Sequence, residues 1–200
     1  MKRRTLTLTP IGVVHSPFAD KRKCAGRDVA RAKKLLADAG LASGYKLEMV
    51  IVNNPQQRRV GEVIQGMARE AGFNITLRPA EFASSLNDSD AGKYQAFLIG
   101  WSGRVDPDGN IHQFHTCGGS QNTTISCDEA VDALLNQARE ASDPAPRAAL
   151  YRDAIEKFTK SRRNIVYLYH LNYIVAHAKS LKGMKAVPDG LIRIKGTSWN

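Results

Sequence analysis

Apolar residues recur at helical spacing along most of the chain, and polar or glycine residues mark where each helical pattern starts and stops. Asp28 precedes the first such stretch and Gly40 follows it, and these residue types are favoured at the two ends of a helix. Asn54 and Pro55 open the second stretch as a cap and a first helical residue. The pattern predicts helices over residues 29–39, 55–71, 81–91, 129–141 and 144–160.

Short apolar or alternating runs between these helices predict strands. The runs at 45–52, 73–78 and 96–101 alternate with helices, and strands connected through helices lie parallel in a sheet. The fold class predicted is therefore α/β, with a mainly parallel sheet flanked by helices. Shorter strands are expected at residues 11–14, 165–170, 173–177 and 191–194.

The strand at 96–101 runs into a polar, glycine-rich turn, and at this junction we expect a binding site. Ligands of open α/β sheets sit beyond the carboxyl ends of the strands, on loops that a rigid scaffold holds. The candidate binding residues are Trp101, Ser102, Gly103, Arg104, Asp106, Asp108 and Asn110. The alternative is an ordinary surface turn, which Pro107 and Gly109 shape and which Asp106 and Asp108 fix through their own hydrogen bonds.

The formal charge of +10 is concentrated near the N-terminus, which limits what it implies. Residues 1–27 carry seven basic residues and one acidic residue, so only +4 belongs to the other residues. We interpret residues 1–27 as a basic lead-in and residues 28–200 as the folded lobe. No RNA-binding signature or aromatic-interleaved basic stripe is present, so we predict no nucleic-acid partner. No apolar run approaches the ~20 residues that cross a bilayer.

Chemical motifs favour binding over catalysis. The sequence contains no GxSxG elbow, HExxH pair, Walker loop or GxGxxG, so we expect neither an enzyme nor a cofactor. The alternative function is a metal-binding domain for zinc or nickel, since His112, His115, Cys117 and Cys127 offer imidazoles and thiolates. Their spacing is irregular and no CxxC pair occurs, so we expect no metal site.

A disulfide between Cys117 and Cys127 is the favoured use of these two thiols. The intervening segment of nine residues includes Gly118 and Gly119 and can close such a ring. The bond would hold the loop by restricting its freedom in the unfolded chain, and it requires an oxidising compartment. Cys24, in the basic lead-in, has no assigned partner.

Several segments, taken together and in order, resemble one family: the family 5 extracellular solute-binding proteins of bacterial ABC transporters, which include dipeptide, oligopeptide and nickel binders. They extend over residues 28–196, most of the chain. The segments are DVARAKKLLADAG, EVIQGMAREAGFNITLRPAEF, YQAFLIGWSGRVDPDGNIHQFHTCGG, EAVDALLNQAREASDPAPRAALYRDA, VYLYH and VPDGLIRIKG.

This resemblance implies a periplasmic-binding-protein-like lobe of class II. The function it implies is binding of peptides or a related small solute between two lobes, followed by delivery to the permease subunits of the transporter. The location implied is periplasmic or extracellular, with membrane contact only through the permease. Family members are typically much longer, so we expect this chain to be the C-terminal portion, without the signal peptide and most of the first lobe.

One position departs from the family pattern and changes the expected ligand. Peptide binders of the family place an aspartate shortly after the Trp-x-Gly turn, where it holds the peptide α-amino group. Here the turn reads Trp101-Ser102-Gly103-Arg104. A guanidinium is matched to a carboxylate or phosphate, so we expect an anionic group on the ligand, with Trp101 against an apolar or planar part of it. The alternative is that Arg104 pairs with an aspartate inside the turn.

Overall fold

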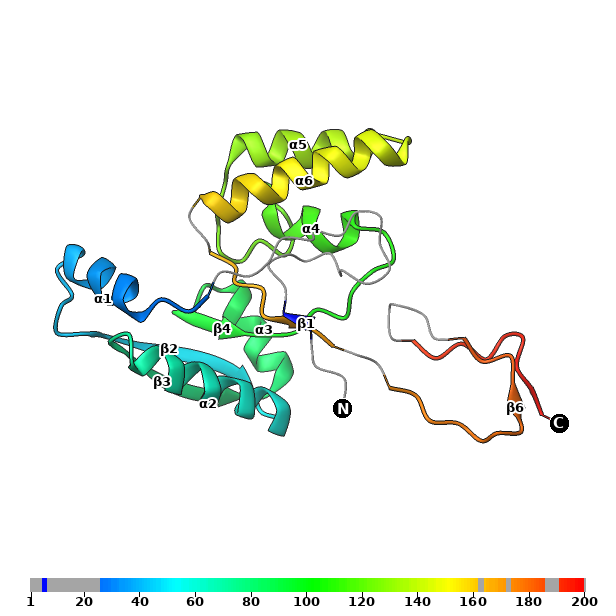
Figure 1. Ribbon diagram of the computed structural model, residues 1–200, viewed down its shortest axis with the longest axis horizontal. Helices are drawn as coiled ribbons and strands as arrows, with labels where there is room; N and C mark the ends of the chain where they lie inside the picture. Colours follow the sequence, from blue (N-terminus) through cyan, green and yellow to red (C-terminus); the bar gives the residue numbers. More distant parts are fainter. Residues whose placement is uncertain (1–4, 7–25, 162–163, 172–173, 186–190, 200) are drawn as a thin grey trace. The chain divides into compact units, whose positions relative to one another are not determined.

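The computed structural model describes residues 5–6, 26–161, 164–171, 174–185 and 191–199 (Figure 1). The chain divides into two compact units. The first, which we call the sheet unit, is Ala25–Trp101; the second, the helix unit, combines Met1–Cys24 with Ser102–Asn200. No helix among the described residues is long and apolar enough to span a membrane.

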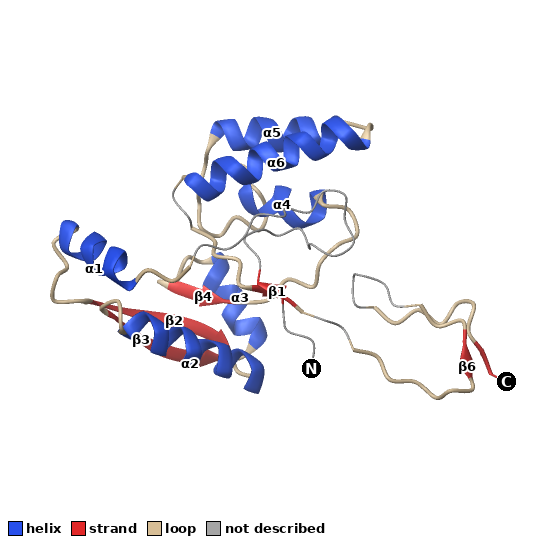
Figure 2. Cartoon of the chain, in the orientation of Figure 1, coloured by secondary structure: helices blue, strands red, loops and turns tan. Residues whose placement is uncertain are grey.

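The sheet unit contains three parallel strands, as the alternation of strands and helices predicts (Figure 2). The central strand β2 (Tyr45–Val52) pairs with β3 (Phe73–Ala80) on one side and with β4 (Ala96–Leu98) on the other. The predicted strand at 96–101 is thus shorter in the structure, whereas the one at 73–78 is longer. The α/β fold class with a parallel sheet is confirmed.

The helices of the sheet unit begin where capping side chains predict. Helix α1 (Val29–Asp38) follows Asp28, whose side chain accepts from the Arg31 N–H. Helix α2 (Pro55–Arg69) follows Asn54, which accepts from Gln57 N–H, and it ends two residues before the predicted end. Helix α3 (Phe82–Asp90) has Glu81 as its cap. Local hydrogen bonds thus fix these helix starts.

The core of the sheet unit lies between the sheet and α2. Met49, Ile51 and Ile75 are buried there. Gly61 lets the helix approach closely, because a Cβ at this position would lie 3.2 Å from a methyl carbon of Leu77. The sheet and α2 are therefore packed closely against each other.

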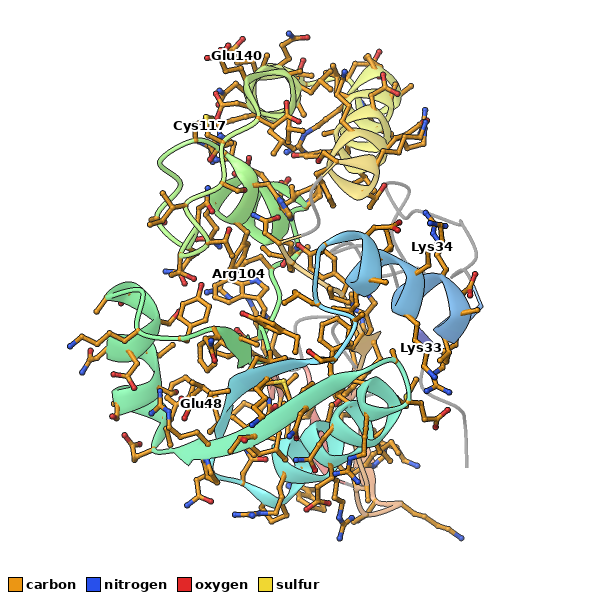
Figure 3. The ribbon with its side chains drawn as sticks, turned by 90° about the vertical axis from the view of Figure 1, so that its left-hand side faces the viewer. Lys33, Lys34, Glu48, Arg104, Cys117 and Glu140 are labelled. Carbon is orange, nitrogen blue, oxygen red and sulfur yellow. A yellow bond between two sulfur atoms is a disulfide. The ribbon has the colours of Figure 1, made fainter. Side chains whose placement is uncertain are left out.

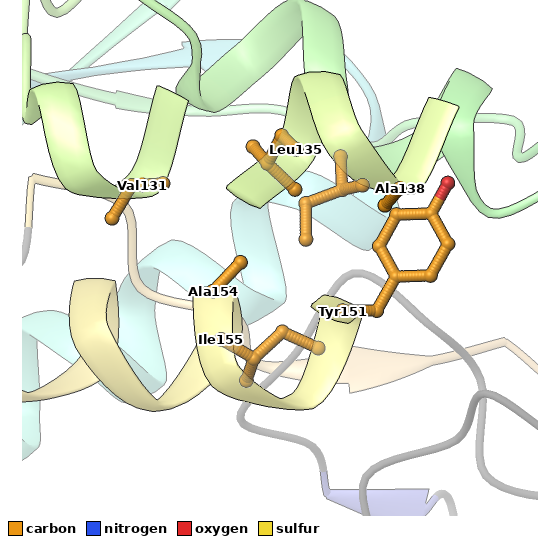
Figure 4. Close-up of a cluster of buried hydrophobic side chains, with 7 residues drawn as sticks. Val131, Leu135, Ala138, Tyr151, Ala154 and Ile155 are labelled. Carbon is orange, nitrogen blue, oxygen red and sulfur yellow. The ribbon is translucent and has the colours of Figure 1, made fainter. Parts of the chain in front are cut away.

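The helix unit is built on a pair of long helices that lie side by side (Figure 1). Helix α5 (Glu129–Glu140) and helix α6 (Pro144–Lys160) are capped by Asp128 and Asp143, as expected from the sequence. Their facing sides bury one apolar cluster, together with a residue of the shorter helix α4 (Asp108–His115). The buried members are Ile111, Val131, Leu135, Ala138, Tyr151, Ala154 and Ile155 (Figure 4).

The remaining strands of the helix unit differ from those predicted. From the stretch 165–170 only β5 (Tyr169–His170) forms, and it pairs antiparallel with β1 (Thr5–Leu6). Residues 174–177 form no strand, and Tyr173 lies outside the described residues. Within 191–194 only Arg193 makes an isolated bridge, to Lys185.

The C-terminal strand pair is instead β6 (Leu181–Lys182) with β7 (Ser198–Trp199). The strand predicted at 11–14 lies outside the described residues. The differences at residues 165–170, 174–177 and 191–194 share one cause: β-branched and aromatic residues favour extended backbone, but a strand also needs a neighbour to pair with, and the neighbour is distant in sequence.

Candidate functional site

The predicted binding residues are divided between the two units. Trp101 is the last residue of the sheet unit, and 42% of its surface is exposed. The other members belong to the helix unit, where they form a compact turn over residues 102–110, which we call the binding turn. Its geometry can therefore be described within one unit.

Asn110 organises the binding turn. Its Oδ1 accepts from the Arg104 backbone N–H at 2.7 Å, and its Nδ2 donates to the Arg104 carbonyl at 2.8 Å. The same Nδ2 donates to the Asp106 carbonyl at 3.1 Å. Asn110 is buried, so these bonds are shielded from water and hold the backbone of Arg104 on both sides.

The second half of the turn is helical, which is a correction to the predicted loop. Helix α4 starts at Asp108, so Asp108 and Asn110 lie in its first turn. Asp106 Oδ1 accepts from the Asp108 N–H at 2.9 Å and so supports this start. Glycine and asparagine are weak helix formers, and the contacts of Asn110 override that preference.

Two arginines from the long helices bind the aspartates of the turn. Arg147 of α6 makes two hydrogen bonds to the Asp106 carboxylate, each of 2.8 Å. Arg139 of α5 makes two to Asp108, of 3.0 and 2.8 Å. The bonds that Arg147 donates hold the pKa of Asp106 below its usual value, and the bonds that Arg139 donates to Asp108 raise the pKa of Arg139. Both carboxylates therefore tie the turn to the helix pair.

Arg104 lies against the start of α4 (Figure 3). Its guanidinium donates to the Ser102 hydroxyl at 3.1 Å and to the Gly103 carbonyl at 2.7 Å, through the same nitrogen. A Cβ on Gly109 would lie 2.8 Å from Cγ of Arg104, so only glycine leaves room for the arginine stem. Gly103 adopts a φ of 82°, which favours glycine as well.

The predicted disulfide is present: Cys117 and Cys127 are bonded (Figure 3). The enclosed loop is held from inside by Asn122, whose Nδ2 donates to the carbonyls of Thr116 and Ser126. The loop follows α4 directly and precedes α5, so the bond closes the connection between these two helices. Cys24 lies outside the described residues.

The four residues of the alternative metal site are engaged separately. The two cysteines are bonded to each other, and His112 Nε2 lies 2.8 Å from Asn136 Oδ1. His115 is buried and stacks on Phe158, with 4.0 Å between the ring centroids. It also hydrogen-bonds to the Tyr167 hydroxyl. In the part of the chain that the structure describes, no three His, Cys, Asp or Glu side chains gather in a way that could hold a metal ion.

An open polar hollow of about 460 Å³ lies beside the disulfide, and no sequence pattern predicts it. It lies between the C-terminal half of α4, the loop after it and one face of α5. Its lining residues are His112, Gln113, Thr116, Cys117, Gly118, Gly119, Ser120, Asp132, Asn136 and Arg139. Polar residues on two helices and an intervening loop carry no local pattern that would have marked them.

Reduction of the disulfide is expected to lower the free energy of unfolding of the helix unit by about 2–3 kcal/mol, because the closed loop is short. Urea denaturation with and without a phosphine reductant measures this change. The double variant Cys117→Ser/Cys127→Ser is the matched control and should not respond to the reductant. Alkylation of both thiols in protein kept under oxidising conditions would contradict the bond.

The family of the chain follows from comparison with known proteins. Residues 3–122 match the family described as bacterial extracellular solute-binding proteins, family 5, middle part. This match covers more than half of the chain and includes the binding turn. The chain therefore belongs to this family.

Two similar curated proteins are named as peptide-binding proteins. The chain is 34% identical to di/tripeptide-binding protein 4 of Pseudomonas aeruginosa over 136 residues, which is 64% of this chain and 25% of that protein. It is 29% identical to a dipeptide-binding protein of Pseudomonas aeruginosa over 174 residues, 83% of this chain and 32% of that protein. The chain thus spans a quarter to a third of the length of these relatives.

Solved structures confirm the fold. HbpA2 from Haemophilus parasuis superposes with a TM-score of 0.78 at 26% identity, over 98% of this chain and 40% of that one. A dipeptide-binding protein from Pseudoalteromonas sp. SM9913, in complex with Met-Leu, gives a TM-score of 0.77 at 21% identity. The superposition covers 98% of this chain and 40% of that protein. The structure thus has the fold of periplasmic binding proteins, as expected from the sequence.

Proposed function

We propose that this chain supplies part of the substrate-binding component of a bacterial ABC importer. In this role it binds a peptide or related small solute between two lobes and delivers it to the permease. The observation that carries the proposal is the family match over residues 3–122, which contains the binding turn. The relatives named as di- and tripeptide-binding proteins support the same ligand class.

The architecture of the turn supports binding. Its aspartates, its asparagine and its glycines hold a fixed backbone geometry, and a preorganised site loses little conformational entropy when a ligand binds. The disulfide and the extracellular description of the family both support a location outside the cytoplasm, where such a bond persists.

The ligand we propose carries an anionic group that Arg104 binds. A guanidinium presents five donors in a planar fork, which matches a carboxylate or phosphate. Asp106, the aspartate nearest to Arg104 in the sequence, binds Arg147 through both of its carboxylate oxygens.

Arg104→Ala is expected to weaken binding of the best ligand on the order of tenfold to a hundredfold, because a charged hydrogen bond is lost. Calorimetry on the full-length protein, with neutral dipeptides, acidic dipeptides and amino-acid conjugates, measures this. Arg104→Asp should weaken the binding of acidic ligands further, because the new carboxylate repels the anionic group of the ligand. Arg152→Ala, at an exposed position of α6, is the matched control.

Two results would contradict these proposals, and they are distinguishable. If the parent protein binds no member of the panel, the peptide-binding function is wrong. If both Arg104 variants bind the best ligand as tightly as the parent, the function stands, and the role of Arg104 as an anion-binding residue is wrong.

A further inference from the structure

One arginine, Arg147, binds the binding turn and also contacts two other parts of the helix unit. Arg147 Nε donates to the Ala138 carbonyl at the end of α5, at 2.9 Å. Its two terminal nitrogens bind the Asp106 carboxylate, and one of them lies 3.2 Å from the Tyr151 hydroxyl. One side chain therefore joins α5, α6 and the turn.

We propose that Arg147 is a positioning residue of the binding turn: from α6, through Asp106, it holds Arg104 in the geometry that receives the ligand. This inference rests on the proposed binding function and names a residue that determines affinity without touching the ligand.

A continuous chain of short contacts leads from Arg147 to Arg104. Arg147 binds the side chain of Asp106, and the Asp106 carbonyl accepts from Asn110 at 3.1 Å. The same Asn110 amide binds the backbone of Arg104 on both sides, at 2.7 and 2.8 Å. A displacement of Asp106 is thus passed to Arg104 through one buried side chain.

Arg147, where this series of contacts starts, is held rigidly. The Arg147 side chain is 16% exposed, and its helix is anchored by Tyr151, Ala154 and Ile155, which are fully buried. The guanidinium lies 5.4 Å from the centre of the Tyr151 ring, a further contact that fixes its plane. A planar fork held this way imposes both the position and the orientation of the carboxylate.

The second arginine is less suited to this role. Arg139 binds Asp108 with a similar two-pronged geometry, but its side chain is 51% exposed. The carboxylates are exposed in the opposite order, 24% for Asp108 and 57% for Asp106, so exposure alone does not rank the two pairs. The difference is that Asp108 lies inside α4, whose hydrogen bonds already restrain it. Asp106 precedes the helix and depends on Arg147.

The test uses Arg147→Met, which keeps an unbranched apolar stem and removes the fork, and Arg147→Lys, which restores the charge alone. Arg152→Met, on an exposed position of the same helix, is the control. The probe is alanyl-glutamate, titrated by calorimetry into the full-length protein. Amide hydrogen exchange of Arg104 reports on the turn without any ligand.

Arg147→Met is expected to lower the affinity for alanyl-glutamate on the order of tenfold. Arg147→Lys should recover part of this loss of affinity. In protein that already carries Arg147→Met, the further change Arg104→Ala should lower the affinity much less than it does in the parent, because Arg104 is already misplaced. Exchange of the Arg104 N–H should become on the order of tenfold faster in Arg147→Met and unchanged in Arg152→Met.

Additive effects of Arg104→Ala and Arg147→Met on affinity, or unchanged affinity with a lowered melting temperature, would overturn the positioning role. If the parent does not bind alanyl-glutamate, the choice of ligand fails separately, and exchange of the Arg104 N–H decides: an unchanged rate in Arg147→Met overturns the inference, and a faster rate supports it.

Discussion

Leu135→Ala is expected to lower the free energy of unfolding of the helix unit by between about 2 and 5 kcal/mol. Leu135 is fully buried at the centre of the cluster between α5 and α6 (Figure 4). Its removal leaves a cavity that two helices, packed along their length, can collapse only in part. The loss exceeds that for a surface leucine because transfer and cavity costs add.

Denaturant unfolding followed by far-ultraviolet circular dichroism, with amide exchange in α5 and α6, measures this loss. Gln137→Ala, exposed on the same helix, is the control and should change stability by only a few tenths of a kcal/mol. Because the sheet unit has a separate core, its amide exchange should not respond to Leu135→Ala. Equal destabilisation by the two variants would contradict the central place of Leu135.

Acidification from neutral pH to pH 4 is expected to lower the free energy of unfolding by up to ~3 kcal/mol through His115 alone. Burial lowers the pKa of His115 from its ordinary value to about 4. The imidazole stacks on Phe158 and lies 2.7 Å from the Tyr167 hydroxyl, and its burial removes most of the water that would hydrate the charged form.

The direction of this pH effect follows from where the proton binds. At pH values between an ordinary histidine pKa of about 6.5 and the pKa of His115 in the folded protein, the imidazole is protonated in the unfolded chain but not in the folded one. Stability is therefore complete above this window and falls as the pH decreases through it. Asp106 acts at lower pH, because its pKa is depressed by Arg147 and its stabilising effect is lost only as the pH falls further.

Unfolding free energies at several pH values between 7 and 4 check the prediction. His115→Gln keeps a polar group beside Tyr167 and removes the titration, so the slope in this window should fall markedly. His177→Gln, at an exposed position, is the control and should retain the parent slope. A parent slope that survives in His115→Gln would assign the pH dependence to other groups.

Features of the fold that depend on neighbours in sequence could be predicted. Asp28, Asn54, Asp128 and Asp143 cap helices through bonds to residues two or three positions away, and such bonds leave a recognisable local pattern. The disulfide was predicted because few pairings were available and the loop between Cys117 and Cys127 is short and glycine-containing.

Features that depend on distant residues could not be predicted. Arg147 reaches Asp106 across 41 positions, and nothing around Arg147 in the sequence distinguishes it from a solvated surface arginine. The pairing of β1 with β5 joins Thr5 to His170, which are far apart in the sequence. Asp106 and Asp108 were recognised as turn residues, but the arginines that bind them were missed.

The two units differ in how their residues are distributed along the chain, and this affects the order of folding during synthesis. The sheet unit is continuous from Ala25 to Trp101, so all its strands are available before the helix pair is made. Domains generally fold as they emerge from the ribosome, N-terminal parts first. The binding turn emerges next, but Arg139 and Arg147 follow it. The binding turn therefore takes its final geometry only after the helix pair that follows it has been made.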